Sequence, residues 1–196
     1  SSGAGTEQLL LESPGPLMAA YAWSSEGVLL YGEVPPKTSG DLWALPMEDD
    51  RKPVPIANSQ FSEVNGQFSP DGRWVAHQSN ESGRHEIYVV PFPPGSGKWQ
   101  VSTGGGMWPR WRHDGKELFF VGPDGEMMAA GITASATTFE AATPVALFKT
   151  RVVAVANVLD DAQYAVSPDG RFLITVPTND STPASMTLLQ NWMPSR

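Results

Sequence analysis

One short motif occurs four times in this chain, and its repetition limits the possible folds more than any other feature. The copies are Trp23–Gly27, Phe68–Gly72, Trp111–Gly115 and Val166–Gly170, and each is followed by an apolar run. Their glycines lie 45, 43 and 55 residues apart. A repeat of this length that is built from short strands is typical of a β-propeller blade. The sequence therefore predicts an all-β propeller of four blades.

The motif itself predicts a tight turn between the first two strands of each blade. An Asp-Gly pair between apolar runs is a strong hairpin signal, because glycine adopts positive φ without steric cost. Third strands are expected at Asp41–Leu45, Glu86–Val90, Glu126–Ala130 and Met186–Leu189, and weaker fourth strands at Val54–Ile56, Trp99–Ser102 and Ala146–Phe148. The long interval before the last copy reads as loop around residues 134–138 and as an extra strand or strand extension over Val152–Ala156.

These elements divide the chain into a leading segment and one domain. Residues 1–6 read as a tag or linker, and residues 7–196 as the propeller, with blades at about 13–57, 58–102, 103–149 and 150–192. Residues 8–12 form an isolated apolar strand that would complete the fourth blade. Three arrangements fit: a closed four-bladed ring, an open half-propeller, or half of an eight-bladed ring that two copies close as a homodimer.

Composition excludes several classes of function. The formal net charge is −8, whereas a nucleic-acid partner requires a basic face, so no nucleic acid is expected. No apolar run approaches the roughly 20 residues of a membrane span, so no membrane insertion is expected. Without cysteine, the chain has no disulfide, thiolate zinc site or cysteine nucleophile.

The repeat resembles the TolB-like propeller family, whose core reads Phe/Trp-Ser-Pro-Asp-Gly, and Phe68–Ala76 fits that pattern fully. Five further segments resemble the propellers that follow bacterial Ser/Thr kinases or winged-helix regulators: Asn80–Phe92, Ser102–Gly106, Pro109–Arg112, Asp114–Phe120 and Asn191–Trp192. The resemblance extends from Leu9 to Trp192. It implies a recognition or sensor domain, not an enzyme, that binds a protein, peptide or small ligand in a periplasmic or other extracytoplasmic compartment.

Two other functions are weaker interpretations of the same sequence. The first is a propeller enzyme, of lyase or lactonase type, with a metal in its channel. The histidines His77, His85 and His113 fall on different elements, even with Asp160 or Asp161 as a further ligand, so we expect no metal site and no cofactor. The second is a purely structural domain that completes a longer propeller.

Binding residues are expected on the face where the loops after the second and fourth strands meet. Those loops are Pro35–Gly40, Asn80–Arg84, Asp180–Pro183, Ser59–Gly66, Gly104–Arg110 and Asn157–Asp161. Loops that a rigid scaffold positions are where proteins commonly bind their ligands. The candidate exposed residues are Glu63, Asn65, Glu81, Arg84, Trp108, Arg110, Asp160 and Asp161.

Overall fold

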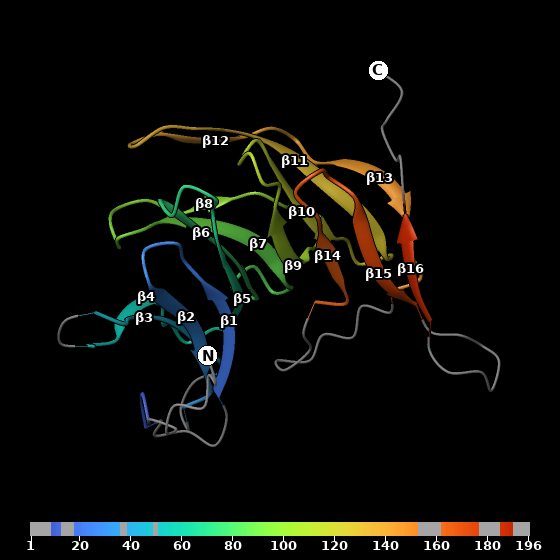
Figure 1. The fold of residues 1–196 in the computed structure, drawn as a ribbon. Helices are drawn as coiled ribbons and strands as arrows, with labels where there is room; N and C mark the ends of the chain where they lie inside the picture. Colours follow the sequence, from blue (N-terminus) through green and yellow to red (C-terminus); the bar gives the residue numbers. More distant parts are fainter. Residues whose placement is uncertain are drawn as a thin grey trace.

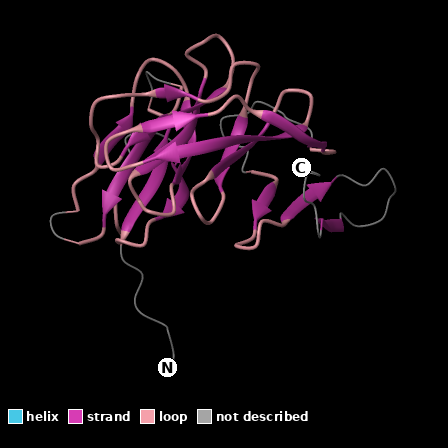
Figure 2. Cartoon of the chain, turned by 90° about the horizontal axis from the view of Figure 1, so that it is seen from above, coloured by secondary structure: helices cyan, strands magenta, loops and turns pink. Residues whose placement is uncertain are grey.

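Strands account for all the regular structure in the described part of the chain. The computed structural model describes residues 9–12, 18–35, 39–48, 51–152 and 162–176, together with the backbone of 185–189. These residues contain strands and turns but no helix (Figure 2). The strands form four antiparallel sheets that follow one another in chain order along an arc (Figure 1). The prediction of an all-β fold with four blades is confirmed.

Each sheet is one blade, and its first three strands pair as a meander; in the third blade β12 and β13 both pair with β11. The first blade contains β1 (Met18–Trp23), β2 (Val28–Glu33), β3 (Asp41–Pro46) and β4 (Val54–Ala57). The second contains β5 (Glu63–Phe68), β6 (Trp74–Ser79), β7 (Glu86–Pro91) and β8 (Trp99–Gln100). The third contains β9 (Met107–Trp111), β10 (Glu117–Val121), β11 (Glu126–Ala134), β12 (Phe139–Ala141) and β13 (Val145–Lys149), and the fourth β14 (Tyr164–Val166), β15 (Phe172–Val176) and β16 (Ser185–Leu189).

The repeated motif forms the turn from the first to the second strand, as predicted. Gly72 has φ +69°, a value that costs glycine little. Ser69 closes the turn, because its Oγ donates to Asp71 Oδ1 at 2.6 Å and accepts from the Trp74 backbone N–H at 3.0 Å. The side chains of Ser167 and Asp169 are hydrogen-bonded in the same way in the fourth blade. The motif is therefore explained by turn geometry.

The core consists of three apolar layers, each between two neighbouring blades. Because successive side chains of a strand point to opposite faces, the second strand of a blade serves two layers. On β6, Val75 belongs to the layer shared with the first blade, and Trp74 and Ala76 to the layer shared with the third. On β10, Phe120 faces the second blade and Phe119 the fourth. Period-two alternation therefore links the sheets in a series.

Hydrogen bonds near the innermost strands join the blades as well. Gln67 Nε2 donates to the Tyr21 carbonyl at 3.1 Å, and Trp111 Nε1 donates to the Gln67 carbonyl at 3.2 Å. The buried Tyr164 hydroxyl donates to the Trp108 carbonyl at 2.7 Å. Each bond crosses from one blade to the preceding one. The inner ends of the blades are thus held in fixed relative positions.

The structure adds one strand that the sequence analysis missed. Strand β11 continues to Ala134 and pairs with β12. The sequence predicted a loop around residues 134–138 and no further strand before Ala146. Phe139 on β12 is buried, with its ring 5.1 Å from that of Trp74 and 5.6 Å from that of Trp99. This hairpin covers the layer between the second and third blades.

Ring closure is not present among the described residues. Leu9–Glu12, the described part of the expected closing strand, is not a strand. The fourth sheet has the order β14-β15-β16, and its inner strand contacts β9, with no contact of similar extent to β1–β4. Most of Val152–Ala156 lies outside the described residues. Closure by a strand at residues 8–12 stays a prediction.

A buried histidine lies within the second blade. His77 on β6 is completely buried, and neither ring nitrogen has a hydrogen-bond partner among the described residues. Its ring stacks on that of Tyr88, with centroids 6.1 Å apart. Burial, aided by the positive charge of Lys98, lowers the pKa of His77 to about 3. The side chain therefore serves as a neutral core residue.

Gly66 tests the close approach of the first two blades. A Cβ at this position would lie 2.6 Å from Leu30 Cδ2 and 2.8 Å from Leu42 Cδ1, and both leucines are completely buried. We expect Gly66→Ala to lower the free energy of unfolding by about 1–3 kcal/mol through overpacking. Urea unfolding would measure this. Gly131→Ala is the matched control, because its Cβ would meet only Ala142 Cβ at 3.7 Å; equal effects of the two substitutions would contradict the close approach.

His77 predicts a loss of stability in acid. As the pH falls below the ordinary histidine pKa of 6.5, the unfolded chain binds a proton there that the folded chain refuses until the pH reaches about 3. From about pH 7 to about pH 5 this difference lowers the free energy of unfolding by about 2 kcal/mol. In His77→Phe and His77→Leu that component should vanish in denaturant titrations at the two pH values. A pH dependence identical to that of the wild type in both variants would refute the assignment.

Candidate functional site

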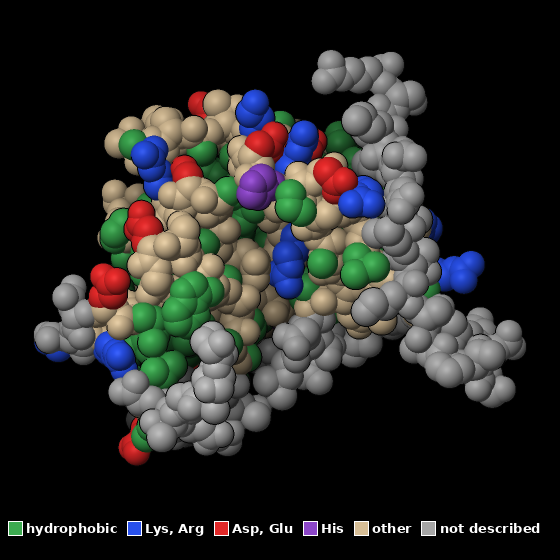
Figure 3. Space-filling view, viewed as in Figure 1, with side chains coloured by type: hydrophobic (Ala, Val, Ile, Leu, Met, Phe, Trp, Pro, Cys, Tyr) green, Lys and Arg blue, Asp and Glu red, His purple; other side chains and the backbone are tan. Residues whose placement is uncertain are grey.

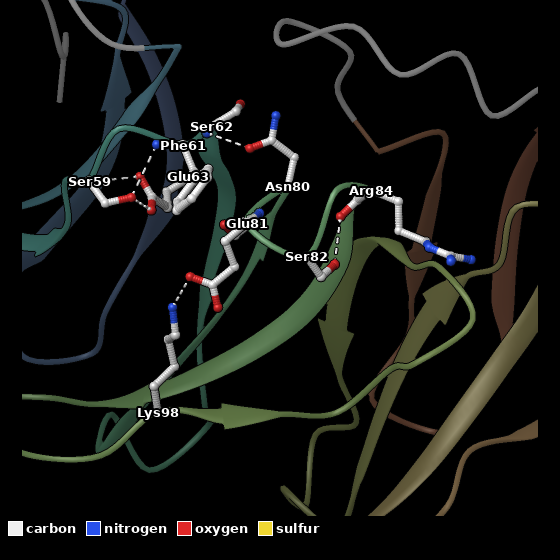
Figure 4. A network of polar contacts seen from close by, with 10 residues as sticks. Ser59, Phe61, Ser62, Glu63, Asn80, Glu81, Ser82, Arg84 and Lys98 are labelled. Atoms are coloured by element: carbon white, nitrogen blue, oxygen red, sulfur yellow. Dashed lines mark hydrogen bonds and ion pairs between the residues drawn. The ribbon is translucent and has the colours of Figure 1, made fainter.

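The loops that follow second and fourth strands lie at one end of the blades, as the meander pattern predicts. Figure 4 shows the part of this end that the second blade and its entry segment form. Six of the eight candidate residues are described there or nearby, whereas Asp160 and Asp161 lie outside the described residues. Three of the six are buried, one as a carboxylate and two on inner strands, and the other three are half-buried or exposed.

Glu63 is a buried residue that fixes the connection between the first two blades. It is 2 % exposed, and its carboxylate accepts hydrogen bonds from the Ser59 hydroxyl and from the Ser59 backbone N–H (Figure 4). Burial raises the pKa of Glu63, and the nearby Asp41 carboxylate adds to the increase, while the bonds from Ser59 oppose it. The expectation that Glu63 is exposed is wrong, because the first residue of β5 lies beneath its own connecting loop.

Asn65 and Trp108 are also buried, contrary to the expectation of exposure. They are 5 % and 1 % exposed, and both have φ +56° beside irregularities in the pairing of β5 and β9. The Trp108 backbone N–H donates to Gln78 Oε1 at 3.0 Å, and its carbonyl accepts the Tyr164 hydroxyl. Bulges of this kind re-aim side chains. At Trp108 the result is a pair of hydrogen bonds that join the third blade to the second and to the fourth.

The remaining candidates, Glu81, Arg84 and Arg110, are half-buried or exposed and have separate contacts. Lys98 forms an ion pair with Glu81 and lies over the Tyr88 ring, 4.8 Å from its centroid. Burial raises the pKa of Tyr88 above its ordinary value. Arg84 is exposed and points away from the Glu81–Lys98 pair (Figure 4). Arg110 on β9 is half-buried and donates to the Pro109 carbonyl at 2.9 Å.

Glu86 is a site residue that sequence reasoning missed. It is 1 % exposed, and both of its carboxylate oxygens accept from the Gly105 backbone N–H at 2.9 Å. The buried Ser102 hydroxyl donates to it as well, and Arg84 Nε lies 3.9 Å away. The Glu86 carboxylate thus binds the backbone N–H group of Gly105 in the glycine-rich loop and holds that loop in place.

A hollow of about 250 Å³ lies between the second and third blades beside this loop. Its walls include Phe120 and Met128, and its rim includes the carboxylate residues Asp124 and Glu126. The other lining residues are Ser102, Thr103, Gly104, Gly105, Gly122, Pro123, Thr143 and Pro144. Space is free above Gly104, where an added Cβ would meet no atom within 4 Å.

Sequence reasoning found one side of this hollow and missed the other. The loop Gly104–Arg110 was a candidate, but the turn at residues 122–125 was not. That turn follows the second strand of the third blade, so the meander pattern places it at the same end as Asn80–Arg84. The sequence Gly122-Pro123-Asp124-Gly125 was the signal that could have identified it.

Two further features are absent from the part of the chain that the structure describes. No group of three histidine or acidic side chains gathers there at a spacing suited to a metal ion. No helix in the same part of the chain is long and apolar enough to cross a membrane.

Comparison with solved structures shows the fold. TolB from Acinetobacter baumannii superposes with a TM-score of 0.66 at 15 % identity, over 94 % of this chain and 44 % of that one. An oligogalacturonate lyase in complex with manganese gives 0.56 at 15 % identity, over 89 % and 49 %. A puromycin-hydrolysing peptidase from Mycobacterium tuberculosis gives 0.55 at 19 % identity, over 81 % and 28 %. The chain thus spans less than half of the length of each of these three proteins.

These neighbours correct the expectation that the chain is not an enzyme. The same fold occurs in a lyase and in a peptidase, so resemblance to a propeller of the TolB kind does not exclude catalysis. At such identities the likeness shows the fold and assigns no activity. Nor does it carry over a compartment, so the extracytoplasmic location stays a prediction.

No family model matches the chain, and no curated protein matches it in sequence. The predicted resemblance is nevertheless confirmed at the level of structure, since TolB is among the neighbours. The chain has the TolB-like β-propeller fold.

Proposed function

We propose that this chain is a recognition domain that binds a segment of a partner protein at the loop-face hollow between its second and third blades. The observation that carries the proposal is this hollow, with an apolar floor at Phe120 and Met128 and an acidic rim. Apolar concave sites with a few convergent polar groups are the usual form of binding sites. The sensory role and the extracytoplasmic setting that the resemblance implies are part of the same proposal.

The size of the hollow favours a peptide side chain over a larger free ligand. Its volume of about 250 Å³ is below the range of roughly 300–1,000 Å³ that is usual for sites of drug-sized molecules. One or two side chains of an extended segment would fill it. Because Asp124 and Glu126 stand at the rim, a segment with a basic side chain is favoured over an acidic one. The net charge of −8 acts in the same direction.

The walls of the hollow are held in place before any ligand arrives. Glu86 fixes Gly105 through its backbone N–H, and the Gly106 N–H donates to the His85 carbonyl at 2.9 Å. On the opposite wall, the Gly122 N–H donates to the Glu126 carbonyl at 2.8 Å. Binding to a preorganised surface avoids part of the entropy cost of ordering loops. The site therefore has the rigidity that selective recognition requires.

A displayed random-peptide library would test the proposal. We expect wild-type protein to enrich peptides with a basic residue beside an apolar one, and their affinity to fall as the salt concentration rises. Gly104→Leu should weaken these peptides about tenfold or more, because the leucine side chain would occupy the hollow. Asp124→Asn should weaken them less and reduce the dependence on salt. Fluorescence anisotropy of labelled peptides gives each dissociation constant.

Gly131→Leu provides the matched control, since it adds the same side chain at an exposed position of β11 away from the hollow. It should leave peptide affinity unchanged. If no peptide is enriched, or if enriched peptides bind Gly104→Leu as tightly as the wild type, the hollow is not the binding site.

A further inference from the structure

Each blade has two faces, and at each end of the arc one face has no neighbouring blade among the described residues. The alternation of side chains along the second strand of each end blade shows which residues lie on that face. Val28 and Leu30 of β2 face the second blade, so Leu29 and Tyr31 face the other way. Phe172 and Ile174 of β15 face the third blade, so Leu173 and Thr175 face outward.

The open face of the first blade is apolar. It contains Leu29, Tyr31 and Leu45, with Ala19 and Ala20 of the inner strand, and a hollow of about 290 Å³ lies over these residues. Figure 3 shows hydrophobic side chains gathered where Figure 1 has β1 and β2. Leu10 and Leu11 also line the hollow. Beneath them Tyr31 and Leu45 are only 4 % and 1 % exposed and Leu29 is half-buried, whereas Leu10 and Leu9 are themselves 39 % and 71 % exposed. The face is therefore covered by this short segment of the same chain and not by a blade.

The open face of the fourth blade presents Leu173, which is 36 % exposed although both neighbours in the strand are buried. Its sheet also ends on an unpaired strand among the described residues, since the order is β14-β15-β16. An unpaired edge beside an exposed apolar face is a site where another sheet can dock.

We propose that the open face of the first blade is the docking surface for the open face of the fourth blade in a second copy of this chain. The argument is continuity with an interface that the chain already forms three times. Leu29 and Tyr31 occupy the strand positions of Val75 and His77, of Leu118 and Phe120, and of Phe172 and Ile174, all of which are buried. Leu173 occupies the position of Leu30, Ala76 and Phe119, which are buried against the next blade.

The symmetry of this contact sets its outcome. The two open faces differ, so the contact is head-to-tail, and a two-fold arrangement of two copies uses both faces of each. The result is a closed ring of eight blades, within the range of roughly four to eight blades that propellers adopt. The segment that contains Leu10 and Leu11 leaves the face when the second copy docks.

Light scattering behind a sizing column tests the proposal on the whole chain. We expect twice the monomer mass of 21.1 kDa at high protein concentration and the monomer mass after dilution. Leu29→Gln and Leu173→Gln, which keep the net charge, should each weaken association about tenfold or more, because each places an unpaired polar group in the contact. Val145→Gln changes an apolar residue that is 59 % exposed on β13 of the third blade, away from both open faces, and should leave the dimer intact.

Mixing the two variants distinguishes a head-to-tail contact from other dimers. A mixed pair retains one intact contact, between Leu29 of the Leu173→Gln copy and Leu173 of the Leu29→Gln copy. Association should therefore recover in part when the variants are mixed, with circular dichroism confirming that each is folded. A wild-type chain that stays at 21.1 kDa over the whole concentration range would overturn the proposal, as would a dimer that both substitutions leave unchanged.

Discussion

The packing of one blade face on the next is the interaction on which the rest of this structure depends. It rests on a simple property of strands, since residues of β6 or β10 alternate between the preceding and the following blade. Each sheet alone would expose an apolar face, so each is stable only beside a neighbour. At the two ends of the arc, no blade in the described part of the chain covers Leu173 or the face over which Leu10 and Leu11 lie.

Buried polar groups hold the blade junctions at the loop face. A buried carboxylate is costly unless hydrogen bonds compensate it, and Glu63 and Glu86 are compensated by Ser59 in one case and by Gly105 and Ser102 in the other. Each joins a strand end to a connecting loop. The buried polar groups at this end therefore hold the loops in place. Only the exposed ones, such as Asp124 and Arg84, can contact a partner.

The turns and the blades could be predicted from the sequence because their causes are local. Ser69, Asp71 and Gly72 close a turn through contacts within five residues. The binding face could be placed only as a set of loops, because exposure depends on contacts between blades that are distant in sequence. Glutamate and tryptophan on a loop are commonly exposed or bind ligands, so the sequence predicted this for Glu63 and Trp108. In the structure a connecting loop buries Glu63 and a backbone bulge buries Trp108. The Gly122–Gly125 turn contains the Pro-Asp-Gly pattern of a hairpin turn, so it could have been predicted from local sequence. Strand β12 could not, because a three-residue strand has no measurable period.

The fold alone leaves function open, since TolB, a lyase and a peptidase share it at 15–19 % identity. What distinguishes this chain is how its own side chains use the loop face. The Glu86 carboxylate already accepts the hydrogen bond of the Gly105 backbone N–H in the glycine-rich loop. This N–H group is therefore not available to an anionic ligand. The two carboxylate residues on the opposite wall, Asp124 and Glu126, have no buried counter-charge among the hollow's lining residues. The residues that line the hollow thus include two acidic side chains and no basic one, and a basic anchor is the group that complements them.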